Sequence, residues 1–151
     1  MADTAGINAS FQLRGVELHQ MSINKLAPGV IPPANFNFDV QIESNVDAAQ
    51  KVIINSATIS VKGDNQPALL GSITCTCFFS VANYEEVVTM KSATQAEIND
   101  AFAETINSIT ISTARGMMAS ELRGTYLHFA FLPIIDVKGL KKNVLAQNIQ
   151  Q

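Results

Sequence analysis

The side chains that could do acid–base or nucleophilic chemistry are few in this sequence and stand apart from one another. Its two histidines, His19 and His128, have no orienting partner that the sequence pattern reveals, as a general base would need. The chain also lacks the GxxxxGK[ST] and GxGxxG loops that cradle phosphates, and the GxSxG nucleophile elbow. We therefore expect no catalytic residues, no cofactor and no enzymatic activity.

The two cysteines, Cys75 and Cys77, are the other reactive groups. They stand two apart on a predicted strand, so both side chains face the same side, in a geometry poorly suited to a mutual disulfide. A zinc site would need paired ligand spacing, and only the two histidines remain to complete it. We expect reduced structural thiols, which are typical of the cytoplasm, and no metal.

Composition sets the class of protein. The 151 residues are 47% hydrophobic and 15% charged, which favours one folded domain over residues 10–151 after a disordered segment 1–9. The net charge of −3 argues against nucleic-acid binding, and no apolar run reaches the roughly 18 residues of a membrane span. The start, MADTAGINAS, has no basic or apolar region typical of a signal peptide. We expect a cytoplasmic protein.

Four strands are predicted in the first half of the chain, over residues 10–25, 35–45, 51–62 and 68–81. Along the first, the apolar residues change phase twice, which indicates either bulges near Gly15 and at His19–Gln20 or a strand buried on both faces. The second alternates cleanly, with Phe36, Phe38 and Val40 on one face. The fourth has only a weakly polar outer side, so we expect the outer face of the sheet to be apolar and to need a partner layer.

Helices are predicted in the second half. Thr94 and Glu97 form a capping-box pattern that favours a helix over 94–107. A second helix follows to about residue 123, where Gly124 provides a stop. An aromatic loop leads to a last helix over 136–147, capped by Asp136. Together these elements predict an α+β fold: a four-stranded antiparallel sheet, meander or Greek key, with C-terminal helices packed on one face.

Apolar side chains exceed what one thin core obviously needs. Phe36 and Phe38 share a strand face, and the loop after the second helix carries Tyr126, Phe129 and Phe131. Two interpretations remain open from the residues alone: ordinary core packing, or an apolar groove that binds extended polypeptides.

Several segments resemble one protein family. ARGMMASELRGTYLHFAFLPI, residues 114–134, is similar to the helix and loop of the SecB protein-export chaperones, including the Ala-Arg pair that opens the helix and the Arg-Gly-Thr-aromatic turn that ends it. FQLRGVELHQMSI (11–23) is similar to the family's first strand, and FFSV (78–81) to the end of its fourth. The resemblance covers about residues 11 to 145.

This resemblance implies an ATP-independent holdase that binds unfolded or pre-secretory polypeptides as a homotetramer, a dimer of dimers. It places the client-binding groove on the second strand, the aromatic loop and the last helix, at Phe36, Phe38, Val40, Tyr126, Phe129, Phe131, Leu140 and Val144. The oligomer interface is expected on the second predicted helix, at Ala114, Met117 and Met118.

The chain departs from the family where SecB docks its motor ATPase, SecA. The family carries an acidic residue followed by a Gln pair there, and this chain has only uncharged residues, from Ser72 to Thr76. We therefore expect weak or absent SecA binding, with client holding unaffected. A SecB-like chaperone that guards an antitoxin is one variant of this hypothesis. The rival hypothesis is a scaffolding oligomer that binds one specific folded partner.

Overall fold

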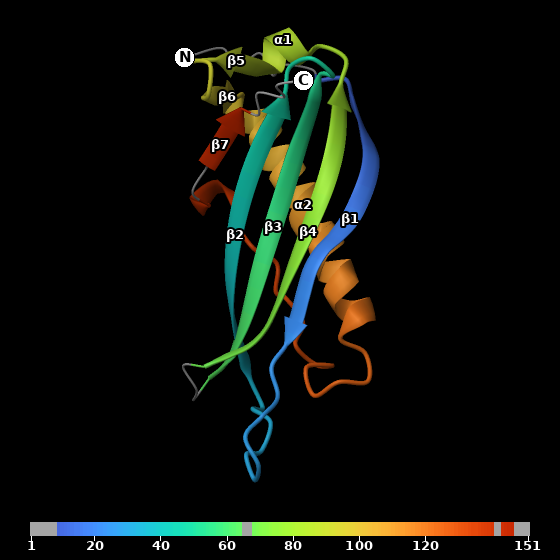
Figure 1. Cartoon of the computed structure of the whole chain (residues 1–151), viewed down its shortest axis with the longest axis vertical. Coiled ribbons are helices and arrows are strands. Elements are labelled where there is room, and N and C mark those ends of the chain that lie inside the picture. The colour runs from blue at the N-terminus through green and yellow to red at the C-terminus, as the bar shows by residue number, and fades with distance from the viewer. Residues whose placement is uncertain (1–8, 65–67, 141–142, 147–151) are drawn as a thin grey trace.

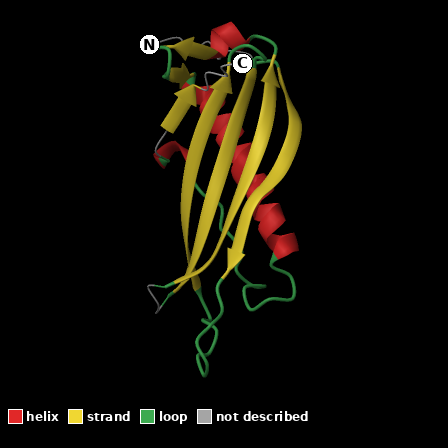
Figure 2. Ribbon diagram, in the orientation of Figure 1, coloured by secondary structure: helices red, strands yellow, loops and turns green. Residues whose placement is uncertain are grey.

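The fold is a twisted antiparallel sheet backed by one long helix (Figure 1; Figure 2). The computed structural model describes residues 9–64, 68–140 and 143–146. Four long strands lie in the order β1-β4-β3-β2, at Phe11–Ile23 (β1), Phe36–Asp47 (β2), Val52–Gly63 (β3) and Leu69–Val81 (β4). Because β2, β3 and β4 are consecutive neighbours and β1 returns beside β4, the topology is a Greek key and not a meander. The predicted α+β class and its four strands are confirmed.

Two bulges in β1 explain the phase changes of its sequence. Its pairing with β4 shifts register between Leu13 and Gly15 and between Leu18 and Gln20, where the sequence predicted bulges. Each bulge returns the next apolar residue to the same side of the sheet. Four apolar side chains of β1 therefore stand opposite buried β4 residues, in the pairs Leu13–Phe79, Val16–Cys77, Leu18–Cys75 and Met21–Ile73.

One continuous helix, α2 (Asp100–Glu121), replaces the two predicted helices. The prediction of a helix over 94–107 with a capping box at Thr94 is wrong, because residues Ala96–Ile98 form a short strand, β6, that pairs with β5 (Val88–Met90). The side chain of Asn99 caps α2 by accepting a hydrogen bond from the Phe102 amide at 3.2 Å. A one-turn helix, α1 (Tyr84–Val87), precedes this hairpin.

The β-branched run at residues 109–111 stays helical inside α2 because tertiary packing outweighs intrinsic propensity. Ile111 is buried against the sheet, and the hydroxyl of the fully buried Thr110 donates to the Ile106 carbonyl at 2.7 Å. The hydroxyl of Thr113 donates in the same way to the Ile109 carbonyl. These bonds satisfy the hydroxyls without breaking the helix.

The C-terminal segment is not the predicted helix over 136–147. Asp136 does cap a turn, accepting from the Lys138 amide at 3.0 Å, but that turn is a 3-10 helix, η1 (Val137–Gly139). A short strand, β7 (Asn143–Ala146), then joins the sheet parallel to β2. The strand gains its backbone hydrogen bonds from β2, a partner that local periodicity does not reveal. Residues 1–8 of the segment predicted to be disordered, and residue 147 of the predicted last helix, lie outside the described residues. Ala9 packs against the core.

The two faces of the sheet differ in polarity. The helix-facing side carries the core, and α2 contacts mainly β3 and β4. The expectation of an apolar outer face is wrong for its centre, where hydroxyls pair across β3 and β4 at 2.9 Å (Ser56–Thr76) and 3.0 Å (Thr58–Thr74). Such pairs satisfy polar side chains on an open sheet face. Within the described residues, no helix is both long and apolar enough to cross a membrane.

Candidate functional site

A single helix leaves both flanks of the sheet's inner face incompletely covered. Strands lie about 4.8 Å apart and a helix is about 10–12 Å wide, so α2 can cover little more than the two central strands. On the β1 flank Leu13, Val16, Leu18 and Met21 remain exposed. On the β2 flank Phe36, Phe38 and Val40 are half-buried at the edge of the core. The β2 flank contains three of the predicted client-binding residues.

The outer edge of β2 is only partly paired. Strand β7 covers Glu43–Val46, with Val144 opposite Ser44. Along residues 36–42 no strand of the described chain lies beside this edge. Unpaired backbone N–H and C=O groups at a strand edge can pair with another extended chain. The half-buried aromatic row and this open edge belong to the same stretch of β2.

The loop after α2 is held rigidly by its backbone and buried side chains. The helix ends at Glu121, and Gly124, three residues further on, adopts the left-handed conformation predicted for it, with φ of +80°. Leu127 is fully buried and approaches Gly71, and Arg115 donates through Nε to the Leu132 carbonyl and through a terminal nitrogen to the Pro133 carbonyl, both at 2.9 Å. The loop is thus a fixed platform.

Large apolar side chains nevertheless project from this loop into solvent. Phe129 is 75% exposed, Phe131 58% and Ile134 95%. Tyr126 is half-buried instead, and its hydroxyl lies within hydrogen-bond distance of the carbonyls of Asn24 and Leu70, to either of which it can donate its one proton. Figure 1 shows the loop at the lower end of the sheet, the end at which β2 begins. A rigid loop that exposes apolar side chains is typical of a binding surface.

The connection between β1 and β2 adds exposed residues that the sequence analysis missed. Ile31 is 83% exposed, and Val30 beside it is also exposed. They lie in LAPGVIPPA, at the same lower end of the sheet (Figure 1). Two β-branched apolar residues between prolines, where no strand can form, were the available signal.

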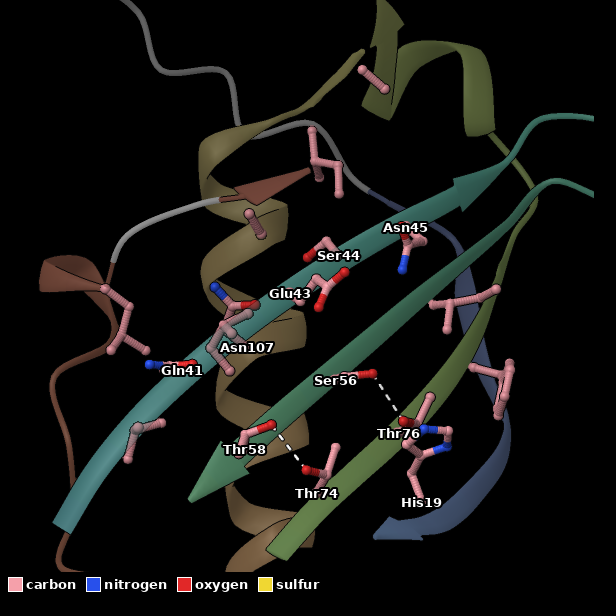
Figure 3. Close-up of a pocket in the computed structure, with 18 of the residues that line it drawn as sticks. His19, Gln41, Glu43, Ser44, Asn45, Ser56, Thr58, Thr74, Thr76 and Asn107 are labelled. Atoms are coloured by element: carbon pink, nitrogen blue, oxygen red, sulfur yellow. Dashed lines mark hydrogen bonds between the residues drawn. The ribbon is translucent and has the colours of Figure 1, made fainter. Parts of the chain in front are cut away.

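A hollow of about 1530 Å³ wraps around β2 farther up the strand (Figure 3). On the outer face it is lined by hydroxyls, His19 and carboxylates. On the helix side it is lined by Val40, Ile42 and Leu140, together with Ala103 and Asn107 of α2. The structure therefore brings the predicted residues Val40 and Leu140 to one cavity, which reaches the open edge of β2.

A buried polar cluster reaches this hollow through Ser44 and Asn107. Asn55 on β3 is fully buried and accepts from the Ser44 hydroxyl at 2.6 Å. Its amide nitrogen lies 2.9 Å from the Thr110 hydroxyl and 3.1 Å from Oδ1 of Asn107. The cluster ties β2, β3 and α2 together, and sequence patterns gave no sign of it.

The predicted interface residues lie partly inside the core. Ala114 and Met118 are buried within the chain itself, and Met117 is half-buried. Contact with a second chain at this position stays a prediction. On the solvent side α2 carries an uncharged row of small exposed residues: Ala101, Thr105, Ser108, Ser112, Gly116 and Ala119.

The two cysteine thiols lie in the core of the fold. Cys75 and Cys77 are free and fully buried. A hydrogen bond to Cys77 and burial raise the pKa of Cys75, which keeps it a thiol. Across the described chain, no group of three or more His, Cys, Asp or Glu side chains gathers in a metal-binding arrangement.

Comparison with known proteins shows the fold. No protein-family model matches the chain, and no curated protein matches it in sequence. The structure is similar to that of a SecB-like chaperone from Mycobacterium tuberculosis in complex with a ChAD peptide from the HigA1 antitoxin, with a TM-score of 0.50 and 14% identity over 83% of this chain and 90% of that one. A protein of unknown function from Streptococcus agalactiae is similar with a TM-score of 0.41 and 12% identity, over 84% of this chain and 98% of that one.

Proposed function

We propose, from the SecB-like fold of this chain, that it is an ATP-independent chaperone that holds extended, unfolded polypeptides on the β2 flank. The proposed client-binding residues are those predicted from the sequence: Phe36, Phe38, Val40, Tyr126, Phe129, Phe131, Leu140 and Val144. Holding a client is non-covalent binding, so this proposed function needs no catalytic group or cofactor.

One observation carries this proposal: half-buried apolar side chains lie directly beside an open strand edge. Phe36, Phe38 and Val40 point toward the core side of β2, and residues 36–42 have no strand beside them within the described chain. An unfolded client exposes apolar side chains and unpaired backbone groups together. The β2 flank offers a complement to both, since added strands gain backbone hydrogen bonds without reading sequence.

We include the exposed aromatic loop in this surface because it lies at the end of the sheet where β2 begins. Removing apolar area from water contributes about 25 cal/mol per Å², and Phe129 and Phe131 have most of their surface available. Their platform is already ordered by Leu127 and Arg115, so binding costs little conformational entropy on the protein side.

We further propose assembly as a homotetramer, which multiplies weak subsites into avidity. Two surfaces support it: the exposed apolar row of β1 (Leu13, Val16, Leu18 and Met21) and the uncharged outer row of α2 that begins at Ala101. An exposed apolar row on a monomer is typical of a contact surface.

A second candidate is a chaperone dedicated to an antitoxin. The similar mycobacterial structure holds an antitoxin peptide, which favours this variant over general export. In addition, Thr74, where export chaperones carry an acidic or amide side chain for SecA, has its hydroxyl paired with that of Thr58. We therefore propose client holding with weak or absent SecA docking. Binding of one folded partner by a scaffolding oligomer is the rival function.

The test is protection of unfolded proteins from aggregation in the absence of ATP. We expect a stoichiometric amount of the chain to suppress aggregation of several unrelated proteins diluted from denaturant, measured by light scattering. A dedicated antitoxin chaperone would protect its own client far better than the others. Failure to protect any of them, with tight binding to one folded protein, would establish the scaffolding alternative.

A further inference from the structure

In the buried cluster around Asn55, the directions of the hydrogen bonds show that one N–H donor has no acceptor among the cluster's own residues. Thr110 donates its only hydroxyl proton to the Ile106 carbonyl at 2.7 Å, so its oxygen must accept from Asn55 at 2.9 Å. The atom of Asn55 nearest Thr110 is therefore its amide nitrogen. The same nitrogen lies 3.1 Å from Asn107, whose nearest atom must then be the carbonyl oxygen, Oδ1.

This assignment leaves the amide nitrogen of Asn107 without a partner in the described part of the chain. The residue is only 3% exposed, yet it lines the hollow beside β2, and Figure 3 shows it on α2 next to that strand. The amide nitrogen is the end of the side chain that is not bonded to Asn55. The nitrogen is accessible from the hollow, so an acceptor from outside the chain can reach it there.

The charges around the hollow decide which acceptor fits. Its lining includes the carboxylates of Glu17, Asp39, Glu43, Glu97 and Asp100, against one lysine, Lys91. Lys91 already pairs with Glu97 at 3.0 Å. Glu17, Asp39 and Glu43 lie on the outer face of the sheet, whereas Glu97 of β6 and Asp100 of α2 are the carboxylates nearest to the helix side. These two carboxylates would repel an anionic ligand, so the favoured acceptor for Asn107 is a neutral carbonyl oxygen. The apolar neighbours Val40, Ile42 and Leu140 fit an acceptor flanked by apolar side chains.

We propose that the amide nitrogen of Asn107 donates a hydrogen bond to a main-chain carbonyl of the client, and so fixes the position of an extended segment along β2. This inference rests on the proposed function and adds a contact residue that no motif indicated. A main-chain carbonyl recurs in every peptide, so the contact positions the client without selecting its sequence.

The test replaces the amide nitrogen of Asn107, which is the donor, and keeps the side-chain oxygen that accepts from Asn55. Asn107→Asp retains an oxygen for Asn55 but presents a second oxygen to the client carbonyl. The probe is reduced, carboxymethylated α-lactalbumin, followed by the tightest of a set of overlapping ten-residue peptides from it, with affinity measured by fluorescence anisotropy. We expect Asn107→Asp to weaken binding about tenfold or more. Gln12→Glu makes the same amide-to-carboxylate change at an exposed position of β1, outside the proposed client-binding surface, and should bind like the parent.

Side-chain amide NMR on the unmodified protein gives a second readout that does not depend on the stability of a variant. Adding the peptide should shift the Asn107 amide protons downfield and slow their exchange with water. Parent-like affinity of a folded Asn107→Asp, or unchanged Asn107 amide signals at saturation, would overturn the inference. Absence of any binding by the parent would instead overturn the proposed function.

Discussion

The amide nitrogen of Asn55 on β3 lies 2.9 Å from the hydroxyl oxygen of Thr110 on α2, and both side chains are fully buried. Apolar contacts alone would let a helix rotate or slide over a sheet at modest cost. A buried polar group that finds its partner in only one arrangement removes that freedom. This pair therefore sets the position of α2 over β3 and of the hollow beside β2.

Loss of the Asn55 amide should destabilise the fold strongly. Asn55→Leu leaves the Ser44 hydroxyl and the Asn107 carbonyl without their partner. We expect the free energy of unfolding to fall by about 2–4 kcal/mol in urea titrations. Asn37→Leu, at an exposed position of β2, should change it by less than about 0.5 kcal/mol. If the two substitutions lowered the free energy of unfolding equally, the hydrogen bonds of Asn55 would not be a specific source of stability.

Two glycines should respond to alanine in opposite directions. A Cβ at Gly71 would lie 2.8 Å from the Leu127 side chain and 3.0 Å from the Ser22 carbonyl oxygen, so Gly71→Ala should cost about 1–3 kcal/mol. A Cβ at Gly116, inside α2, meets nothing within 4 Å. Gly116→Ala should stabilise the chain by about 0.5–1 kcal/mol. Thermal melting should show a lower melting temperature for Gly71→Ala and a higher one for Gly116→Ala. A lower melting temperature for Gly116→Ala would indicate a contact at that position.

Removal of the Tyr84 hydroxyl should be tolerated. The hydroxyl is buried and has no hydrogen-bond partner in the described structure. Tyr84→Phe should therefore leave the free energy of unfolding unchanged or raise it by about 1 kcal/mol at neutral pH. A loss above that amount would reveal a partner for the hydroxyl.

The same variant should differ from the parent at high pH. Burial, followed by the charges of Asp47 and Glu85, raises the pKa of Tyr84 in the folded chain. The unfolded chain then releases this proton first, so the parent loses stability as pH rises above about 10, the ordinary tyrosine value. Tyr84→Phe should lack this part of the loss in urea titrations at pH 9 and 11.

Polar substitutions in the proposed client-binding surface should separate its exposed and half-buried parts. Phe129→Ser removes a side chain that is 75% exposed, so stability should stay within about 0.5 kcal/mol while affinity for unfolded client falls. Phe38→Ser should weaken client binding too, with a loss of about 1–3 kcal/mol in stability because Phe38 packs against the core. A Phe129→Ser variant that holds clients as well as the parent would remove the loop from the site.

Assembly should depend on the apolar row of β1. We expect the chain to form a tetramer in multi-angle light scattering at micromolar concentration. Leu18→Lys places a charge on a side chain that is 39% exposed, so it should shift the chain toward smaller species without unfolding it. A monodisperse monomer of the unmodified chain would contradict the assembly proposed here.

Local periodicity was enough to predict the four long strands of the sheet. The alternation of Phe36, Phe38 and Val40 set one face of β2, and the phase changes around Gly15 and His19 located both bulges of β1. These signals lie within one strand, because side-chain direction depends only on the backbone of neighbouring residues. The left-handed conformation of Gly124 was predictable for the same reason, since it depends on the residue type at that position.

The helices and the site depended on partners far away in the chain. Residues 109–111 favour strand by propensity, but packing against the sheet keeps them in α2, and β7 exists because β2 offers it an open edge. The free donor of Asn107 follows from bonds that reach across 51 to 55 residues of sequence, from Asn55 to α2. The sequence by itself determined the four long strands and the two places where the first of them could bulge. Only the tertiary structure decided which apolar flank stays open and which buried polar group is left to bind, because both depend on what one helix can cover.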